Sequence, residues 1–230
     1  MPTPRCVTCQ IKNHSILKNC SDDVLEDISD KKVCVSVQRG ERLLSEGEEA
    51  KHVYCIRSGV AKVEVQKNGK ALILRLESKG ALISSRLFEK KANQPLTVTA
   101  LEPMQLCQLD GEQFRMLSQK NPSLRTEMIK SLVTEIQNAE QRALSLVYNT
   151  VRERVAAVLL HIAEIYHYTQ DGCSIHVQLY RQDIAELAGT TKEQVSLALA
   201  ELREAKLVNF KAKHFKHFDL EGLKKIAEKA

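Results

Sequence analysis

Two kinds of hydrophobic spacing divide the chain. Between about residues 33 and 109, short apolar segments such as VCVSV, HVYCI, AKVEV and ALILRL alternate with polar positions, and glycines separate them where turns are expected. The segment KNGK, at residues 67–70, sets an Asn-Gly pair between two such segments, which is typical of a tight hairpin. The spacing therefore predicts a compact β-roll or barrel.

From residue 121 onward, apolar residues recur every three or four positions, as they do on one face of a helix. The first such helix carries a heptad seam with small residues at two positions. The seam would pack either on the chain's own β-roll or on a second copy. Because it is continuous and joins two domains, it favours a homodimer. The predicted interface residues are Ile129, Leu132, Ile136, Ala139, Ala143 and Leu146.

The stretch YRQDIAELAGTTKEQVSLALAELREAKL, at residues 180–207, predicts a helix-turn-helix. Gly189 is expected to end the first helix, and one of the two threonines that follow would cap the second. Val195, Leu199 and Leu202 form the apolar stripe of the second helix. The residues expected on the opposite, outward side are Lys192, Glu193, Ser196, Leu197 and Ala200. An ordinary helical hairpin would show the same pattern, so the rest of the chain must decide.

The segment LVNFKAKHFKHFDL, at residues 207–220, predicts a two-stranded wing, and the last ten residues predict a helix. Residues 206–217 contain four lysines, two histidines and no carboxylate, a patch suited to neutralising phosphates. Net charge is a weaker argument. The whole chain carries +5, but residues 151–230 hold 12 basic and 11 acidic side chains, a difference of only +1.

Composition excludes several classes of protein. The hydrophobic share of 43% and charged share of 27% are those of a globular protein, and 230 residues are enough for two domains. The sequence has no apolar run of membrane-span length and no signal-peptide core at its start, so we expect a cytoplasmic protein without a membrane partner. It also lacks a nucleophile-base pair, a phosphate loop and an HExxH motif, so we expect no enzyme.

The segments RGERLLSEGEEAKHVYCIRSGVAKVEV and YRQDIAELAGTTKEQVSLALAELREAKLV resemble the Crp/Fnr family of bacterial transcription regulators, and the order of elements is similar over nearly the whole chain. The resemblance implies an α+β fold with an N-terminal cyclic-nucleotide-binding-like β-roll, a long dimerisation helix and a C-terminal winged helix-turn-helix. The expected boundaries are an arm at 1–20, a β-roll at 21–120, the helix at 121–148 and the DNA-binding domain at 149–230.

The family resemblance also implies partners. We expect a homodimer that binds a near-palindromic site in double-stranded DNA and works with RNA polymerase, switched by a redox, gas or small-molecule signal. The alternative is a ligand- or metal-binding module whose helical C-terminal domain docks a protein.

The Fnr branch reads DNA through Glu-x-x-Ser-Arg, and the matching residues here are Glu193, Ser196 and Leu197. Glu193 would accept from a cytosine amino group, and Ser196 would bond to base edges. Leu197 replaces the arginine that would contact guanine, so it would either touch a thymine methyl or pack on the first helix. The predicted phosphate contacts are Arg181, Thr191, Lys192, Lys211, Lys213 and Lys216.

Two departures from the family concern the signal. Relatives that bind cyclic nucleotides have Gly-Glu and Arg-Ser or Arg-Thr pairs in the roll, where this chain has Ser84-Ser85 and Pro95-Leu96. Arg86 is the only nearby cation. A buried phosphate would lack its cation and amide donors, so the sequence argues against cAMP.

The second departure concerns a 4Fe–4S cluster, which the Fnr branch holds with three arm cysteines and one β-roll cysteine. Cys6 and Cys9 have the family's spacing and Cys107 matches the β-roll position, but Ser15 replaces the third arm cysteine. Cys20 would have to supply that ligand if the arm is flexible, giving the set Cys6, Cys9, Cys20 and Cys107.

Two alternatives to the cluster remain open. The CxxC pair would be a family remnant with Cys107 a buried apolar residue, or the arm cysteines would form a thiol switch. The strand cysteines Cys34 and Cys55 are expected in the core.

Overall fold

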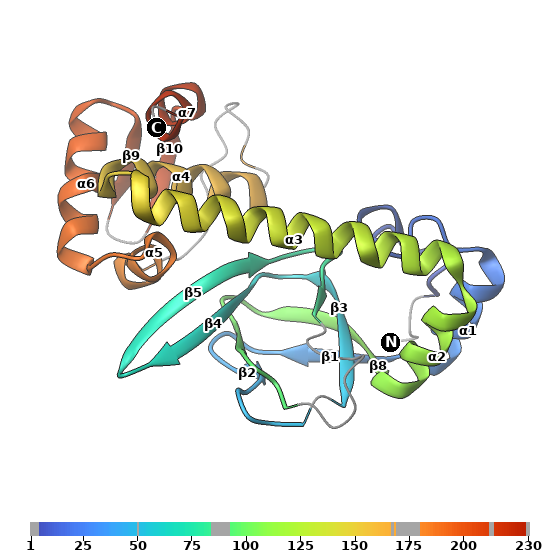
Figure 1. The fold of residues 1–230 in the computed structure, drawn as a ribbon. Helices are drawn as coiled ribbons and strands as arrows, with labels where there is room; N and C mark the ends of the chain where they lie inside the picture. The colour runs from blue at the N-terminus through green and yellow to red at the C-terminus, as the bar shows by residue number, and fades with distance from the viewer. Residues whose placement is uncertain are drawn as a thin grey trace. The chain divides into compact units, whose positions relative to one another are not determined.

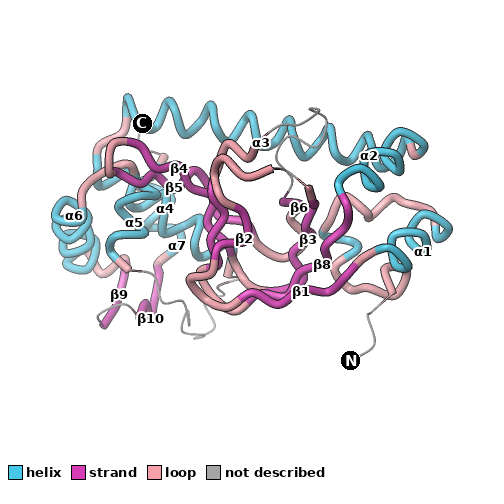
Figure 2. Tube along the Cα trace, turned by 90° about the horizontal axis from the view of Figure 1, so that it is seen from below, coloured by secondary structure: helices cyan, strands magenta, loops and turns pink. Residues whose placement is uncertain are grey.

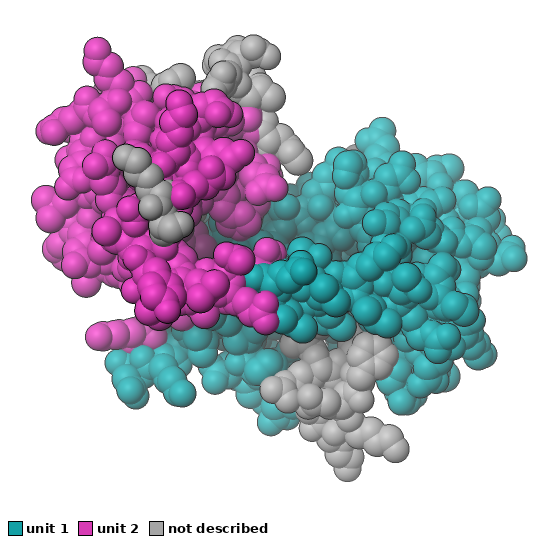
Figure 3. Space-filling model, turned by 45° about the horizontal axis from the view of Figure 1, so that its top comes forward, with its two compact units in different colours: residues 1–69, 74–137 teal, residues 70–73, 138–230 magenta. Residues whose placement is uncertain are grey.

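The computed structural model describes residues 5–49, 51–83, 93–166, 168, 180–211 and 214–228. The chain divides into two compact units, one of residues 1–69 and 74–137 and the other of residues 70–73 and 138–230 (Figure 3). None of the helices in the described ranges is both long and apolar enough to cross a membrane.

The strands between residues 33 and 110 form a β-roll, as the alternating pattern predicts (Figures 1 and 2). One four-stranded sheet has the order β1-β8-β3-β6, and the other has the order β2-β7-β4-β5. The strands are β1 (Val33–Val37), β2 (Arg42–Leu44), β3 (His52–Ser58), β4 (Ala61–Lys67), β5 (Lys70–Glu77), β6 (Leu82–Ile83), β7 (Thr97–Ala100) and β8 (Met104–Asp110). The turn between β4 and β5 has positive φ at Asn68 (52°) and Gly69 (73°), the geometry of the predicted tight hairpin.

Two apolar clusters cover the two faces of the β1-β8-β3-β6 sheet. The inner core lies between the sheets and includes Ile56 of β3 and Leu106 of β8. The outer core covers the opposite face, where Val53 and Leu109 meet residues of the N-terminal segment and of the helices beside it. Because successive side chains of a strand point to opposite faces, neighbouring residues of β3 and β8 are divided between the two cores.

Three helices contribute residues to the outer core. They are α1 (Asp22–Lys31), α2 (Gly111–Lys120) and the beginning of α3 (Pro122–Tyr148). The short helix η1 (Lys12–His14), in the N-terminal segment, has no buried residue. In the long helix α3 only Leu124, Glu127 and Met128 are buried. The rest of α3 therefore contributes little to the core of either unit.

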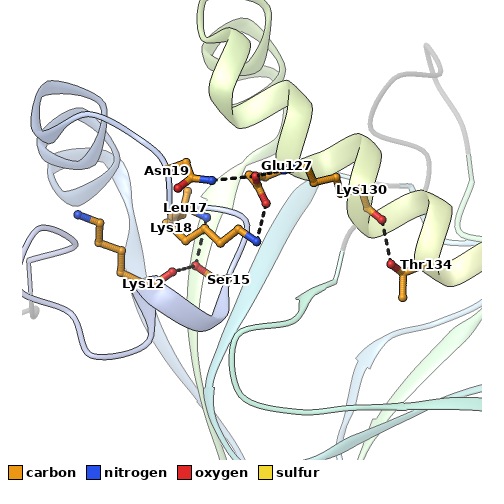
Figure 4. A network of polar contacts seen from close by, with 8 residues as sticks. All are labelled: Lys12, Ser15, Leu17, Lys18, Asn19, Glu127, Lys130 and Thr134. Atoms are coloured by element: carbon orange, nitrogen blue, oxygen red, sulfur yellow. Dashed lines mark hydrogen bonds and ion pairs between the residues drawn. The ribbon is translucent and has the colours of Figure 1, made fainter.

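Glu127 fastens the N-terminal segment to α3 (Figure 4). Its carboxylate accepts hydrogen bonds from Asn19 Nδ2 at 2.9 Å and Lys130 Nζ at 2.8 Å, and it pairs with Lys18 Nζ at 2.9 Å. The hydrogen bonds from Lys130, Lys18 and Asn19 lower the pKa of Glu127 to about 2. The ionised carboxylate of Glu127 therefore links α3 to the N-terminal segment, about 100 positions earlier in the chain.

The second unit contains α4 (Val151–Ile165), α5 (Arg181–Ala188), α6 (Lys192–Glu204), β9 (Val208–Lys211), β10 (His214–Phe218) and α7 (Leu220–Ala227). Helix α4 packs against α5, α6 and α7. Strands β9 and β10 pair antiparallel and form the predicted wing. The strand expected between residues 170 and 179 lies outside the described residues.

An aromatic stack, which the sequence pattern did not reveal, fixes the wing. Phe218 is fully buried between Tyr168 and Phe215, whose ring centroids both lie 5.4 Å from its own. The Phe218 backbone N–H also donates to Tyr168 Oη at 3.1 Å. The wing is thereby held to the rest of the unit by large rigid side chains.

Candidate nucleic-acid interface and cysteine cluster

The helix-turn-helix is formed by α5, a short turn and α6. Gly189 ends α5 in the left-handed conformation (φ 62°, ψ 46°), and Thr191 caps α6 by accepting from the Gln194 N–H at 3.3 Å. Both features follow from residue types that the sequence places at those positions.

Two arginines hold the end of α5. Arg142 Nη2, from α3, donates to the carbonyl of Leu187 at 2.7 Å and to that of Glu186 at 3.4 Å. Arg154 Nε, from α4, donates to the carbonyl of Ala188 at 2.9 Å. These cations satisfy carbonyls that a helix end leaves unpaired and complement the negative end of its dipole. The turn before α6 is therefore fixed from two other helices.

The outward face of α6 carries the three predicted base contacts. Val195, Leu199 and Leu202 are buried as predicted, whereas Glu193, Ser196 and Leu197 are exposed. Leu197 is 66% exposed, so it does not pack on α5.

Two of these side chains present acceptors. Hydrogen bonds from its own backbone N–H and from Thr191 lower the pKa of Glu193, which stays an ionised acceptor at neutral pH. Ser196 Oγ donates to the Lys192 carbonyl at 2.9 Å, which leaves its lone pairs outward.

The predicted phosphate contacts surround this face unevenly. Thr191, Lys192 and Lys211 are exposed, whereas Arg181 is half-buried, with its guanidinium 5.3 Å from the centre of the Phe210 ring. Arg203 stacks on the same ring at 5.5 Å, so the aromatic residue of β9 orients two cations beside the helix-turn-helix. Lys213 and the side chain of Lys216 lie outside the described part of the chain.

The predicted dimer seam lies on an open face of α3. All six predicted residues are exposed in the single chain, with Ile129 at 60% and Ile136 at 58%. Packing of the seam on the chain's own β-roll, the alternative that the sequence left open, is therefore not what the structure shows. The exposed large apolar side chains of α3 are Ile129, Leu132, Val133, Ile136, Leu144, Leu146, Val147 and Tyr148. A contiguous exposed patch of this kind favours a protein interface.

The strand cysteines form a row across three adjacent strands. In the strand register, Cys107 of β8 lies opposite Cys34 of β1 and opposite Cys55 of β3. Cys107 is buried, whereas Cys34 and Cys55 are only half-buried. We call Cys34, Cys107 and Cys55 the thiol row. The expectation that Cys34 and Cys55 are simple core residues misses this arrangement, since strand register cannot be read from sequence spacing.

The arm cysteines divide into two environments. Cys6 belongs to the outer core, and the Cys9 N–H donates to its carbonyl at 3.3 Å. Cys20 also lies in the outer core, where burial raises the pKa of its thiol. The charge of Lys12 opposes this shift, and that of Glu127 adds to it. Ser15, at the third cysteine position of the Fnr pattern, donates to the Lys12 carbonyl at 2.9 Å and closes a turn instead (Figure 4).

Of the four predicted cluster ligands, Cys6 and Cys20 lie in the outer core, Cys9 lies in the turn after Cys6, and Cys107 lies in β8. In the described ranges no group of three or more His, Cys, Asp or Glu side chains is placed so that it could hold a metal ion, and the six described cysteines are free thiols.

A small cavity lies inside the β-roll. Among the described residues that line it, Arg75 is the only cation, and its guanidinium is paired with two carboxylates. Arg75 Nε bonds to Glu77 Oε1 at 2.6 Å, and Arg75 Nη1 pairs with Glu135 Oε1 at 2.7 Å. The lining residues are Leu44, Val63, Arg75, Glu77, Ile83, Leu96 and Val98. Ser84, Ser85 and Arg86, on which the argument against cAMP rests in part, lie outside the described residues.

Comparisons with known proteins agree with the expected domains. The profile of the cyclic nucleotide-binding domain matches residues 34–121, and that of the Crp-like helix-turn-helix domain matches residues 153–226. The fumarate and nitrate reduction regulatory protein of Yersinia pestis is 26% identical over 228 residues, which cover 96% of this chain and 86% of that protein. The cAMP-activated global transcriptional regulator CRP of Pasteurella multocida is 26% identical over 169 residues, covering 73% of this chain and 81% of the other.

Among solved structures, FixK2 from Bradyrhizobium japonicum matches with a TM-score of 0.75 at 20% identity, covering 86% of this chain and 98% of that one.

Proposed function

This chain belongs to the Crp/Fnr family of transcription regulators, and we propose that it reads a near-palindromic duplex as a homodimer, with one α6 helix of each subunit in the major groove. Regulators of this family are not enzymes, in agreement with the absence of catalytic motifs from the sequence. No observation favours the alternative function, a ligand- or metal-binding module whose helical C-terminal domain docks a protein.

The exposed face of α6 supports this proposal most directly. Its acceptor groups on Glu193 and Ser196 and the apolar tip of Leu197 project from a helix whose opposite face is fully buried. A helix fixed in this way holds its outward groups in one geometry, which base readout requires. Thr191, Lys192 and Lys211 would contact phosphates on either side and set affinity without setting sequence.

The open apolar face of α3 supports the homodimer. Six residues spaced as one helical seam are exposed in the single chain, and a second copy of the same helix would cover them. A two-fold dimer would place two α6 helices on half-sites about one helical turn of DNA apart, which is the reason for a near-palindromic site.

We propose that the signal acts on the N-terminal segment and β-roll and that it is not cAMP. Arg75 would be the cation for a nucleotide phosphate in the described lining of the cavity, yet two carboxylates already engage it. RNA polymerase is a proposed partner because the homologous proteins are transcription regulators.

A matched pair of substitutions on α6 tests the base contacts. Operator sequences would be selected from a random duplex pool, and affinities then measured by fluorescence anisotropy over a range of salt concentrations. Glu193→Gln should change discrimination at one base pair by about 1–3 kcal/mol. Glu204→Gln makes the same change at the other end of α6 and should leave discrimination unchanged. An unchanged base preference in Glu193→Gln would contradict the proposed docking.

The oligomeric state is tested separately by sedimentation. Ile136→Lys places a charge in the seam and should give monomers, whereas Gln137→Lys, at the next exposed position, should remain dimeric. A dimeric Ile136→Lys protein would show that the subunits meet elsewhere.

A further inference from the structure

Cys107 lies between two other cysteines on neighbouring strands. In the thiol row it is opposite Cys34 of β1, which is at the edge of the described sheet, and opposite Cys55 of β3. Residues directly opposite each other on paired strands point to the same face, with Cβ atoms about 4.5–5.5 Å apart. The three thiols therefore lie side by side on one face of the sheet.

The two pairs in the row differ in their backbone hydrogen bonds. In antiparallel strands the N–H and C=O of one residue point to the same side of the strand, and that side alternates from residue to residue. Ile56 of β3 donates its N–H to the Ala81 carbonyl at 3.0 Å and accepts from the Gly80 N–H at 2.9 Å, so its backbone groups point away from β8. Cys55, directly before Ile56, therefore points its backbone groups toward Cys107.

A second hydrogen bond gives the same alternation. The N–H of Gly111, directly after β8, donates to the Lys51 carbonyl at 2.8 Å, so Lys51 points toward β8. Cys55 follows Lys51 by an even number of residues, and the register of β3 with β8 is regular from His52 to Ile56. Cys55 and Cys107 thus form a hydrogen-bonded pair, and Cys107 turns its backbone groups away from Cys34.

The pair of Cys34 and Cys107 is therefore the closer one. Cα atoms lie about 4.5 Å apart in a pair without hydrogen bonds and about 5.5 Å apart in a hydrogen-bonded pair, and the side chains are correspondingly closer in the first. A disulfide requires Cβ atoms about 3.5–4.5 Å apart, at the near end of the cross-strand range. Because β1 is an edge strand, a small approach to β8 breaks no strand pairing on its other side.

A guanidinium lies beside the outer member of this pair. Arg57 Nη1 lies 3.9 Å from Cys34 Sγ, and Arg57 Nε is buried without a hydrogen-bond partner among the described residues. A cation in contact with sulfur stabilises negative charge there, and the thiolate is the form of cysteine that reacts with oxidants. Cys34 is also half-buried, whereas Cys107 is buried. An oxidant would therefore meet Cys34 first.

The other two thiols of the row hold their protons. Burial raises the pKa of Cys107 to about 11 and that of Cys55 to about 12. Both are neutral thiols at pH 7, so neither competes with Cys34 for an oxidant. Cys107 is instead placed to react with Cys34 after it has been oxidised.

We propose that Cys34 and Cys107 form an oxidation site for hydroperoxides, in which Cys34 is oxidised first and Cys107 then closes a disulfide with it. The Cys34 thiolate attacks one peroxide oxygen, the O–O bond breaks, and a sulfenic acid forms while the other oxygen leaves with a proton as water or an alcohol. The Cys107 sulfur attacks the sulfenic sulfur, and its proton leaves with the hydroxyl group as water. One hydrogen peroxide and two thiols thus give one disulfide and two waters.

The disulfide would link two parts of the unit that are distant in sequence. Cys34 is the second residue of β1, which begins directly after the end of α1, and Cys107 belongs to the strand between β1 and β3. The bond would therefore fix the end of α1 on the sheet. This inference goes beyond the proposed function, because the oxidation does not depend on DNA binding.

The experiment uses the full chain, purified with a reductant and then freed of it without oxygen. After treatment with hydrogen peroxide, the remaining thiols are alkylated, and the protein is digested without reduction for mass spectrometry. A disulfide between Cys34 and Cys107 within one chain is expected. A disulfide that joins Cys107 to Cys55 or to an arm cysteine, one that joins two chains, or no disulfide would overturn the proposal.

Serine variants assign the roles within the row. In Cys107→Ser the oxidation should stop at the sulfenic acid of Cys34, which a dimedone probe captures, and the absence of that adduct would overturn the proposed order of attack. Cys55→Ser, on the other side of Cys107, is the matched control and should form the disulfide as the parent does. Circular dichroism shows whether each variant is folded, and the mapping of the parent chain decides the pairing without them.

The part played by Arg57 is tested by rate. Arg57→Met should slow the oxidation of Cys34 by about two- to fivefold, the effect of one partly exposed charge. Arg42→Met makes the same change at an exposed position of the other sheet and should be oxidised at the parent rate. Equal rates in the two variants would remove Arg57 from the proposal.

Duplex binding, measured on the same preparations, separates this inference from the proposed function. A chain that forms the Cys34–Cys107 disulfide but binds no duplex, reduced or oxidised, would refute the regulator and leave the oxidation site standing. A chain that binds its operator but forms no such disulfide would refute the oxidation site alone.

Discussion

Replacement of Arg142 by Met tests how the helix-turn-helix is held in place. Methionine keeps much of the apolar stem of Arg142 but removes the guanidinium that donates to the carbonyls of Leu187 and Glu186. Because α5 leads directly into the turn and α6, loss of this support should destabilise the DNA-binding unit and loosen the recognition helix.

The magnitude follows from the two contacts. A hydrogen bond from a charged group contributes about 1.5–3 kcal/mol, and the contact at 2.7 Å has full strength, whereas that at 3.4 Å exceeds the usual range. A cation at a helix C-terminus adds about 0.3–1 kcal/mol. Burial lowers the pKa of Arg142, so the native arrangement also carries a cost that methionine avoids. The expected net loss is about 2 kcal/mol.

Urea unfolding followed by far-UV circular dichroism measures this loss. With a denaturant slope of about 2 kcal/mol per molar, the midpoint of the second unit should fall by about 1 M. Arg125→Met makes the same change at an exposed position of α3 and should shift the midpoint by less than about 0.3 M. If Arg142→Met and Arg125→Met have the same urea midpoint, the two carbonyl contacts do not support α5 and the reasoning is refuted.

Three further predictions concern single positions. Leu197→Arg should gain preference for guanine at the base pair that Leu197 faces, and an unchanged profile on a panel of half-sites would contradict the proposed register of α6. Gly189→Ala should lower stability by about 1–2 kcal/mol in thermal unfolding, because an alanine at φ 62° is strained and its Cβ would lie 2.5 Å from Leu146 Cδ2; a Tm equal to that of the parent would refute this. The pKa of Glu127 is about 2 when folded and 4.5 when unperturbed, so its contribution to stability is complete above pH 4.5 and is lost as pH falls toward about 2. Glu127→Gln should flatten the acid limb of stability against pH, whereas Glu26→Gln, at an exposed position of α1, should not.

Local rules of sequence fixed the elements of the DNA-binding unit. Gly189 ends α5 and Thr191 caps α6 because backbone conformation and capping depend on residues a few positions apart. The spacing of Val195, Leu199 and Leu202 likewise decides which side of α6 is buried. For the same reason Asn68 and Gly69 were sufficient to predict the hairpin between β4 and β5.

The arrangement of distant residues needed the tertiary structure. The sequence could not show that Arg142 and Arg154 hold the last turn of α5, since these contacts depend on packing between helices. The cysteines are the clearest case. The sequence led us to expect Cys55 as a core residue and gave no sign that it pairs with another cysteine. Strand register places it opposite Cys107, and a shift of one residue in a strand would turn every side chain to the other face. The sequence determined that the chain has seven cysteines, and only the pairing of β1, β8 and β3 placed Cys34, Cys107 and Cys55 opposite one another.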